Sequence, residues 1–245
     1  MNQIDYWNER AKKYGNTIKA VNNDVIAEQL EYNEIFKEIK GTESILDLGC
    51  GNGLLIKAIE DKFPNCKVEG VELTKGLGDL ANNSCKGEIT ICSSGDPFLP
   101  DVLNKYDIII TKRLLVNLSN KDLGETLCNI RAMLKPNGKY IMVECFKEPL
   151  ERVNKIRETL NLPIIKVDAK HNTYLSESFV ETLPFRKKFK NDFMSFYYLV
   201  SRTLNAKLSS ADYNSEINNI SKLININLEG YSPEVMWIFR GDEKW

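Results

Sequence analysis

Short apolar runs and amphipathic segments alternate along most of this chain. The run YDIIIT at 106–111 is nearly all apolar, which is typical of a strand that is covered on both faces of a sheet. In the segment 24–40, Val25, Ile26 and Leu30 lie at helical spacing. Strands and helices that alternate in this way predict an α/β fold with a parallel, doubly wound sheet.

The same patterns give bounds for each element of that sheet. Asp96-Pro97 is typical of an N-cap followed by the first residue of a further helix. The predicted strands are 44–48, 67–72, 88–92, 106–111 and 139–145. The predicted helices between them are 53–62, 76–82 and 121–134, the last followed by a turn that ends at 138.

The two ends of the chain are expected to add to this sheet. Segments 1–16 and 24–40 are predicted to be helices across the sheet edge or over a ligand cleft. We divide the chain into 1–43, 44–146 and 147–245, because the pattern after 146 is less regular. That last part is predicted to contain helices at 149–161 and 176–183, a loop at 163–175, a strand at 189–199, helix through most of 203–227 and a strand at 235–239.

Length, charge and cysteine content narrow the class of protein. The 245 residues, 42% of them hydrophobic, fit one domain with embellishments or a domain plus a small cap. A net charge of −1 gives no overall field that would attract nucleic acid, and no apolar run approaches the length of a membrane span. Six cysteines without a C-x-x-C pair and a single histidine argue against a zinc site. Reduced thiols and a polar N-terminus favour a cytoplasmic protein without a signal peptide.

One stretch carries the pattern of a nucleotide-binding loop. Residues 45–53, ILDLGCGNG, begin as an apolar run and end as a glycine-rich turn before a predicted helix. A dinucleotide fingerprint has glycine at its first, third and sixth positions. Counted from Gly49, the third position is Gly51, but the sixth is Leu54 and the third glycine is Gly53. The spacing therefore disfavours a dinucleotide.

The form Asp47-x-Gly49-x-Gly51-x-Gly53 resembles the first motif of class I S-adenosylmethionine-dependent methyltransferases. The resemblance covers 44–146 well. It implies a Rossmann-like, seven-stranded, mainly parallel sheet with helices on both faces, here with C-terminal helical insertions. It also implies S-adenosylmethionine as the cofactor, bound by 44–146 beneath the segment 1–43, with 147–245 on the substrate side.

Polar residues at the carboxyl ends of the predicted strands are the candidates for cofactor binding. Glu72 ends the second strand, and an ionised carboxylate accepts hydrogen bonds from both ribose hydroxyls. The resemblance implies the same role for Glu72, with Leu73 packing against the adenine. It also implies that Asp96, beside Pro97, bonds the adenine amino group, although a helix N-cap alone would explain this acid. Asp47 is expected to orient the methionine part or support the loop, and if buried it needs N–H or ammonium partners. The loop residues expected at the cofactor are Gly49, Cys50 and Gly51.

The N-terminal segment from Tyr6 to Tyr14 looks like one that lies over the cofactor in many small-molecule methyltransferases. There an aromatic residue and an arginine reach the methionine carboxylate, which implies contacts from Tyr6, Trp7, Arg10 and Tyr14. An arginine suits a carboxylate because its fork donates two hydrogen bonds. An amphipathic helix that only packs against the protein is the alternative.

Four residues are candidates for the reacting end of the site. Arg113 and Asn117 follow the strand 106–111, where many methyltransferases carry residues that face the transferred methyl group, and Arg113 is also a candidate cofactor contact. His171 is the first candidate for a base that removes a proton from an acceptor hydroxyl. Glu144, at the end of the strand 139–145, is the second candidate, with a structural acid as the alternative.

The stretches around Asn117, His171 and 196–202 also resemble a bacterial group found with surface-polysaccharide biosynthesis. We therefore expect an enzyme that methylates a small polar acceptor, namely a hydroxyl or carboxylate of a sugar or nucleotide-linked sugar. A monomer and a homodimer are both compatible with the sequence. N-methylation of a small amine and another nucleotide-binding enzyme, such as an NAD-dependent dehydrogenase, stay open as alternatives.

Overall fold

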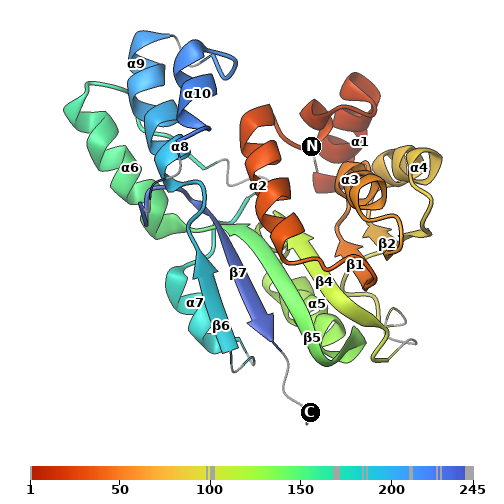
Figure 1. Ribbon diagram of the computed structural model, residues 1–245. Coiled ribbons are helices and arrows are strands. Elements are labelled where there is room, and N and C mark those ends of the chain that lie inside the picture. The colour runs from red at the N-terminus through yellow and green to blue at the C-terminus, as the bar shows by residue number, and fades with distance from the viewer. Residues whose placement is uncertain are drawn as a thin grey trace.

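The computed structural model describes residues 2–97, 99, 103–167, 172–183, 185, 187–209, 212–224, 226 and 228–240. These residues build a seven-stranded sheet (Figure 1). The strands are β1 Ser44–Leu48, β2 Lys67–Glu72, β3 Ile89–Ile91, β4 Tyr106–Lys112, β5 Leu134–Cys145, β6 Lys187–Asn191 and β7 Glu234–Arg240. Their order is β3-β2-β1-β4-β5-β7-β6, and β7 runs antiparallel to both of its neighbours while the other pairs are parallel. The predicted doubly wound, mainly parallel sheet is confirmed.

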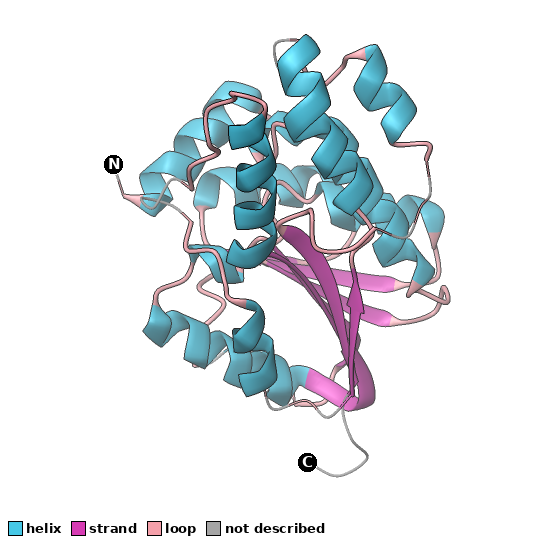
Figure 2. Ribbon diagram, turned by 90° about the vertical axis from the view of Figure 1, so that its left-hand side faces the viewer, coloured by secondary structure: helices cyan, strands magenta, loops and turns pink. Residues whose placement is uncertain are grey.

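Helices cover both faces of the sheet (Figure 2). The α-helices are α1 Gln3–Tyr14, α2 Val25–Lys37, α3 Leu54–Lys62, α4 Lys75–Ser84, α5 Asn120–Met133, α6 Lys147–Thr159, α7 Glu177–Thr182, α8 Ser195–Val200, α9 Ala206–Leu208 and α10 Glu216–Ser221. The shorter turns are η1 Ile18–Ala20 and η3 Leu115–Asn117, which are 3₁₀, and η4 Ser201–Asn205, which is π-helical. Among the described residues, no helix has the length and apolar composition that crossing a membrane requires.

The core lies in two layers, one on each face of the sheet. In β4, Ile108 and Ile110 pack with residues of α2 and α3, whereas Ile109 packs with residues of α5 and α7. This alternation is what a strand with period-2 side chains must show when both faces are covered. Burial on both faces explains why the nearly continuous apolar run at 106–111 predicted a buried strand.

The prediction of a single strand over the aromatic segment 189–199 is wrong beyond residue 191. The strand β6 ends at Asn191, and the chain turns into α8. In α8, Tyr197 and Tyr198 pack with Met194 against Ile26 of α2 and Val153 of α6. These contacts at spacings of three and four residues favour a helix over the strand preference of aromatic side chains.

Other predicted bounds also change. The described part of 203–227 is helical in short pieces only, namely the end of η4, α9 and α10. The strand predicted from 139 begins at Leu134, with a register irregularity against β4 and a left-handed Asn137 at φ +62°. At Asp96 the described residues show a turn, in which the carbonyl of Asp96 accepts from the N–H of Leu99 at 3.1 Å.

Candidate functional site

A cavity of about 410 Å³ lies at the carboxyl ends of β1, β2 and β4. Its lining comes from α1, the glycine loop 49–53, the ends of β2 and β4, the loop 172–174, and the C-terminal insertion with Arg202 and Tyr213. The helices α1 and α8 to α10 lie at this end of the molecule (Figure 1). Ligands of open α/β sheets bind at this edge, so the position agrees with the glycine loop.

The glycine loop bends sharply where it meets the cavity. Gly51 has φ +58°, and a Cβ added there would lie 2.8 Å from Cγ1 of Val21. The N–H groups of Gly49 and Cys50 both donate to the carbonyl of Val71, at 2.8 and 2.9 Å, which fixes the loop to the end of β2. The three predicted loop contacts, Gly49, Cys50 and Gly51, all line the cavity.

Glu72 lies at the cavity wall and supports the loop at the same time. One carboxylate oxygen accepts from the N–H of Gly51 at 3.0 Å, and the other accepts from the N–H and hydroxyl of Thr74 at 2.9 and 2.7 Å. Burial raises the pKa of Glu72, while these donors oppose the rise.

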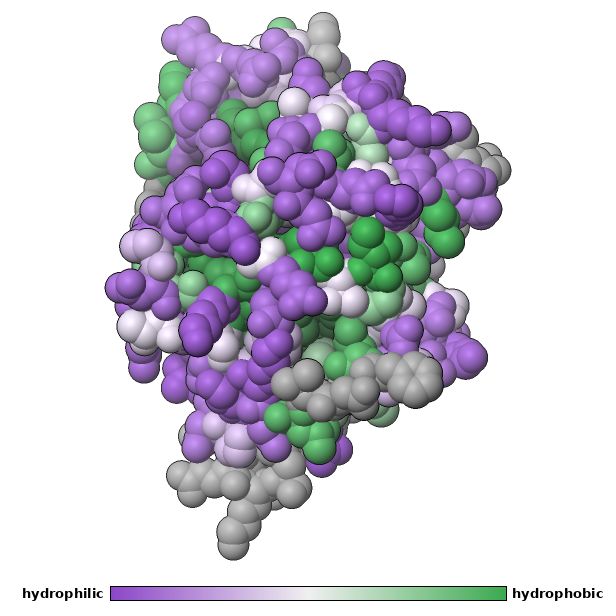
Figure 3. Space-filling model, turned by 90° about the vertical axis from the view of Figure 1, so that its right-hand side faces the viewer, coloured by the Kyte–Doolittle hydropathy of each residue, from purple (hydrophilic) through white to green (hydrophobic). Residues whose placement is uncertain are grey.

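Leu73 also lines the cavity and is 42% exposed. Figure 3 shows the side of the molecule that carries α1 and α4, where hydrophobic surface lies among hydrophilic side chains.

Asp47 is a buried acid without a hydrogen-bonded partner. It lines the cavity and is 2% exposed, and its side chain accepts no hydrogen bond from any described residue. Burial raises the pKa of Asp47 to about 7, against an opposing contribution from Lys112. The expected N–H or ammonium partners are therefore missing within the described protein, and a ligand is left to supply them.

The N-terminal helix α1 covers one side of the cavity. Tyr6, Trp7 and Arg10 line it, whereas Tyr14 does not. The guanidinium of Arg10 donates to the carbonyl of Ala20 at 2.8 Å and lies 5.1 Å from the ring centre of Tyr14. Tyr14 therefore supports Arg10 from outside the cavity. The helix packs against the protein and also forms part of the cavity wall, and its contacts with a cofactor stay a prediction.

The predicted contact from Asp96 and Pro97 is not seen in the cavity lining. The turn after β3 brings Cys92, Ser93 and Ser94 to the cavity, while the carbonyl of Asp96 accepts from Asn129 of α5 at 2.9 Å. The turn thus carries Asp96 towards α5. The geometry of the turn after β3 therefore decides which residues line the cavity.

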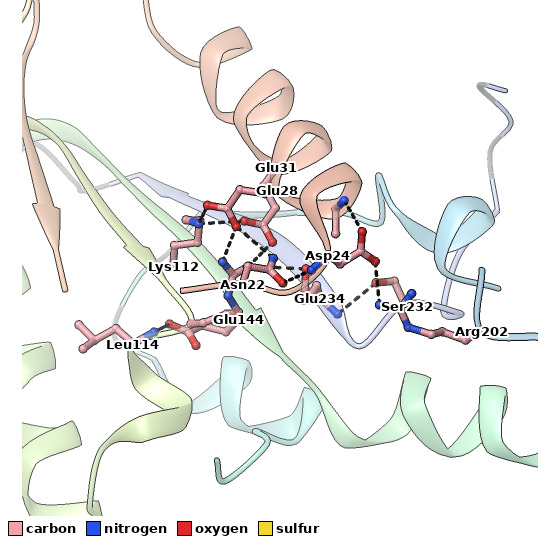
Figure 4. A network of polar contacts seen from close by, with 12 residues as sticks. Asn22, Asp24, Glu28, Glu31, Lys112, Leu114, Glu144, Arg202, Ser232 and Glu234 are labelled. Atoms are coloured by element: carbon pink, nitrogen blue, oxygen red, sulfur yellow. Dashed lines mark hydrogen bonds and ion pairs between the residues drawn. The ribbon is translucent and has the colours of Figure 1, made fainter. Parts of the chain in front are cut away.

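A cluster of charges at the end of β4 was missed by the sequence reading (Figure 4). Glu28 and Glu31 of α2 are fully buried and pair with Lys112 and Arg113. The Arg113–Glu28 distance is 2.7 Å, and Lys112 lies 3.2 Å from Glu31. Arg113 and Lys112 lower the pKa of Glu28 despite its burial, whereas burial raises that of Glu31. Arg113 lines the cavity, but its guanidinium binds α2, so the predicted contacts with cofactor and methyl group are not supported.

Asn117 and Glu144 lie close together but have different surroundings. Asn117 lines the cavity, its amide donates to the carbonyl of Arg113 at 2.6 Å, and its buried Oδ1 has no hydrogen-bond partner among the described residues. Glu144 is fully buried outside the cavity lining and accepts from the N–H groups of Leu114 and Leu115 at 3.0 and 2.9 Å. A third donor, the N–H of Val116, lies at 3.4 Å. Burial raises the pKa of Glu144 to about 7. The alternative of a structural acid fits this placement, and the base role does not.

His171 lies outside the described residues. Its neighbours Asn172 and Tyr174 line the cavity, and the N–H of Thr173 donates to the carbonyl of Val116 at 2.6 Å. The predicted loop therefore passes beside the turn that carries Asn117.

The part of the cavity wall that Asp24, Arg202 and Tyr213 form is polar, and the sequence did not predict it. Asp24 caps α2 by accepting from the N–H of Ala27 at 3.0 Å, and its second oxygen accepts from Arg202 at 2.8 Å. Tyr213 completes this wall. No group of His, Cys, Asp and Glu side chains in the described part of the chain has the arrangement of a metal site.

Comparison with known proteins gives a family match over most of the chain. A family model described as O-methyltransferase domain matches residues 6–170. The chain is 25% identical over 140 residues to a ribosomal protein L11 methyltransferase of Dictyoglomus turgidum, a match that covers 56% of this chain and 44% of that protein. It is 28% identical over 138 residues to a malonyl-[acyl-carrier protein] O-methyltransferase of Priestia megaterium, covering 55% and 48%. The chain thus spans less than half the length of these curated relatives.

Solved structures share the fold. A crystal structure of a SAM-dependent methyltransferase from Archaeoglobus fulgidus superposes with a TM-score of 0.58 at 18% identity. The match covers 86% of this chain and 93% of that one. At this identity the similarity shows a common architecture, and the acceptor must be inferred from the cavity.

Proposed function

Because this chain belongs to the O-methyltransferase domain family, we propose that it methylates a hydroxyl group of a small polar acceptor, namely a sugar or nucleotide-linked sugar. The family and the fold imply S-adenosylmethionine as the methyl donor. They do not favour the NAD-dependent dehydrogenase that the sequence left open. The expected place in surface-polysaccharide biosynthesis stays part of the proposal.

The cavity fits this cofactor on two observations. The buried carboxylate of Asp47 lacks a partner, which suits the ammonium of the methionine part. A Cβ at Gly51 would lie 2.8 Å from Cγ1 of Val21, so only glycine lets the loop pass so close to this part of the cavity wall. We assign the ribose hydroxyls to Glu72 and the adenine to Leu73, and we assign the methionine carboxylate to Arg10. Bound there, the cofactor supplies a sulfonium methyl group for in-line displacement.

The observation that carries the acceptor proposal is the unpartnered Oδ1 of Asn117. Asn117 follows the carboxyl end of β4 and lines the cavity, and its buried Oδ1 needs a hydrogen-bond donor. A second hydroxyl of the acceptor supplies that donor, which leaves the proton of the reacting hydroxyl free to pass to the base. The cavity wall also holds several other amides, each of which both donates and accepts, as a polyhydroxylated ligand requires. They are Gln3, Asn22, Asn23, Asn52 and Asn172, of which Asn22 already donates to Glu28 and accepts from the N–H of Asp24.

A hydroxyl acceptor must lose its proton during the transfer. Glu144 is fully buried and bound to backbone N–H groups, which leaves His171 as the base in this proposal. Holding the acceptor oxygen and the methyl group in line contributes up to about 7–11 kcal/mol in favourable intramolecular cases. The chain's main task is then orientation by Asn117. We expect His171→Ala to lower turnover more than cofactor affinity.

The proposal is tested by incubating the protein with labelled S-adenosylmethionine and a panel of neutral sugars, nucleotide sugars and small amines. We expect a product heavier by one CH₂ from a hydroxyl-bearing acceptor, detected by mass spectrometry. Asn117→Ala should lower turnover without changing the affinity for S-adenosylhomocysteine. Asn219→Ala, on α10 outside the cavity lining, is the matched control. Methylation of amines alone would contradict the proposal and support the N-methyltransferase alternative.

A further inference from the structure

The helix that carries Arg202 contains an unusual turn. Residues 195–208 form one continuous helical stretch from α8 through η4 to α9, and η4 is π-helical over Ser201–Asn205. Such turns are rare, are found mostly as single insertions in α-helices, and occur frequently at functional sites. Arg202 lies in this turn and lines the cavity. The turn thus marks the place where this helical stretch meets the cavity.

The side chain of Arg202 is held in a defined position. Its guanidinium donates to Asp24 at 2.8 Å and to the hydroxyl of Ser201 at 2.7 Å. It also lies 4.6 Å from the ring centres of both Tyr198 and Tyr213. Contacts with aromatic faces leave the N–H groups in the guanidinium plane available for acceptors. The side chain is 16% exposed, so it is desolvated without being closed off.

The other cationic side chains that line the cavity already have partners within the protein. Lys112 and Arg113 face Glu28 and Glu31, and Arg113 also lies 3.8 Å from Glu234. Three carboxyl groups thus surround two cations. Arg10 has no carboxylate partner among the described residues, but it donates to carbonyls of η1 and to Asn23, and the proposed function assigns it to the methionine carboxylate.

Arg202, in contrast, pairs with a single carboxylate, that of Asp24. This carboxylate also accepts hydrogen bonds from other donors. The other oxygen of Asp24 accepts from the N–H of Ala27 and from the hydroxyl of Tyr197, at 3.0 and 2.8 Å. Two of the five guanidinium N–H groups have acceptors in the hydrogen bonds to Asp24 and Ser201. Arg202 is therefore the cavity cation best placed to take a second anion.

We propose that Arg202 binds an anionic group of the acceptor, a carboxylate or a phosphate, at the end of the cavity formed by η4. This rests on the proposed function and narrows its acceptor to an acidic sugar or a nucleotide-linked sugar. The amide side chains of the cavity wall bind the hydroxyls of the acceptor, and Arg202 binds its anionic group. Together they set the distance between the anionic group and the hydroxyl that is methylated. Arg202 is then the residue that selects for charge.

A simpler role for Arg202 is to tie the N-cap of α2 to the helix 195–208 through Asp24. The two roles predict opposite results for one variant. Asp24→Asn keeps a capping side chain but removes the competing carboxylate. If Arg202 binds the acceptor anion, this change frees Arg202 and tightens anion binding. If Arg202 is only a tie, Asp24→Asn and Arg202→Gln have the same effect.

The test uses the full chain saturated with S-adenosylhomocysteine, titrated by calorimetry with glucuronate, with UDP-glucose and with glucose. We expect at least one anionic probe to bind about tenfold or more tightly than glucose, because charge-assisted hydrogen bonds are the strong ones. Arg202→Gln should remove this preference and leave glucose binding unchanged. Arg202→Lys should retain part of it, and Asp24→Asn should strengthen it. S-adenosylhomocysteine binding, measured first in every variant, shows that the variant is folded.

The outcomes separate the sources of the anion. Binding of glucuronate alone assigns a carboxylate, and binding of UDP-glucose alone assigns a phosphate. Absence of anion binding, an unchanged preference in Arg202→Gln, or an equal loss in Asp24→Asn and Arg202→Gln overturns the inference. Failure of the wild-type chain to bind S-adenosylhomocysteine would instead overturn the proposed function.

Discussion

Replacing Asp47 by Asn should stabilise the protein without cofactor and weaken cofactor binding. The carboxylate is 2% exposed, and burial raises its pKa from an ordinary value of 3.8 to about 7. Each tenfold change in acidity corresponds to 1.36 kcal/mol, so ionised Asp47 costs the folded state up to about 4 kcal/mol. Asparagine resembles the protonated acid in shape and carries no charge, so this cost is absent in the variant.

The sign of the pH dependence follows from the raised pKa. Between pH 3.8 and about 7 the folded protein holds a proton on Asp47 that the unfolded chain has lost. The contribution of Asp47 to stability is therefore greatest at low pH and is lost as the pH rises through 7. The advantage of Asp47→Asn over the wild type should grow by about 3 kcal/mol between pH 5 and pH 8. Denaturant unfolding at the two pH values, without cofactor, measures this difference.

Calorimetry at pH 8 supplies the second half of the test. S-adenosylhomocysteine retains the amino group of the methionine part, and a hydrogen bond between charged groups contributes about 1.5–3 kcal/mol. Asp47→Asn should then weaken its binding roughly 10- to 150-fold. The control is Asp107→Asn, where Lys135 and Ser44 oppose burial and lower the pKa of the acid, at the opposite end of the strands. It should lose stability and leave cofactor binding unchanged. Lower stability of Asp47→Asn at pH 8, or unchanged affinity, would refute the reasoning.

Three further predictions address the loop and its supports. Glu72→Gln should weaken S-adenosylhomocysteine binding by roughly tenfold or more in calorimetry, because it removes a charged acceptor from the cavity wall; equal affinity would exclude the ribose role. Gly51→Ala should destabilise the protein by about 1–2 kcal/mol or more, since φ is +58° and the Cβ would meet Val21, whereas Gly124→Ala, with open space in α5, should stabilise it by about 0.5–1 kcal/mol. Glu144→Ala should cost about 3 kcal/mol or more in unfolding experiments, because buried N–H groups lose their acceptor, and Glu144→Gln should cost less. Equal losses in the two Glu144 variants would argue against that account.

The regular part of the fold was predictable because its signals are local. The bounds predicted for the first two strands, 44–48 and 67–72, agree with β1 and β2. Strands buried on both faces read as apolar runs, and a glycine turn follows the first of them. The segment 189–199 lacked such a signal, since its aromatic residues suit a strand as well as a helix. Met194, Tyr197 and Tyr198 lie at helical spacing, and this was the available evidence for α8.

The site was predictable only where one element supplies it. The glycine loop and Glu72 follow directly from strand ends, whereas the polar wall joins residues far apart in the chain. Asp24 and Arg202 are 178 positions apart, and Arg113 is 85 positions from Glu28. No periodicity connects such residues. A partial signal existed in Glu28 and Glu31, two acids three positions apart beside the apolar positions of α2.

The left-handed backbone at Arg113 explains how these distant elements hold this part of the cavity wall in place. Successive residues of a strand point to opposite faces, so Lys112 and Arg113 would ordinarily diverge. With φ +53° at Arg113, both side chains reach α2. A strained conformation of this kind costs about 1–3 kcal/mol, whereas leaving one of these buried charges without its partner would cost more, about 3–5 kcal/mol. Directly after Arg113, Glu144 binds the N–H groups that begin η3. The turn that ends at Asn117 is therefore fixed by α2 through charge and by β5 through hydrogen bonds. That double attachment keeps Asn117 in one position in the cavity wall, although its Oδ1 has no partner among the described residues.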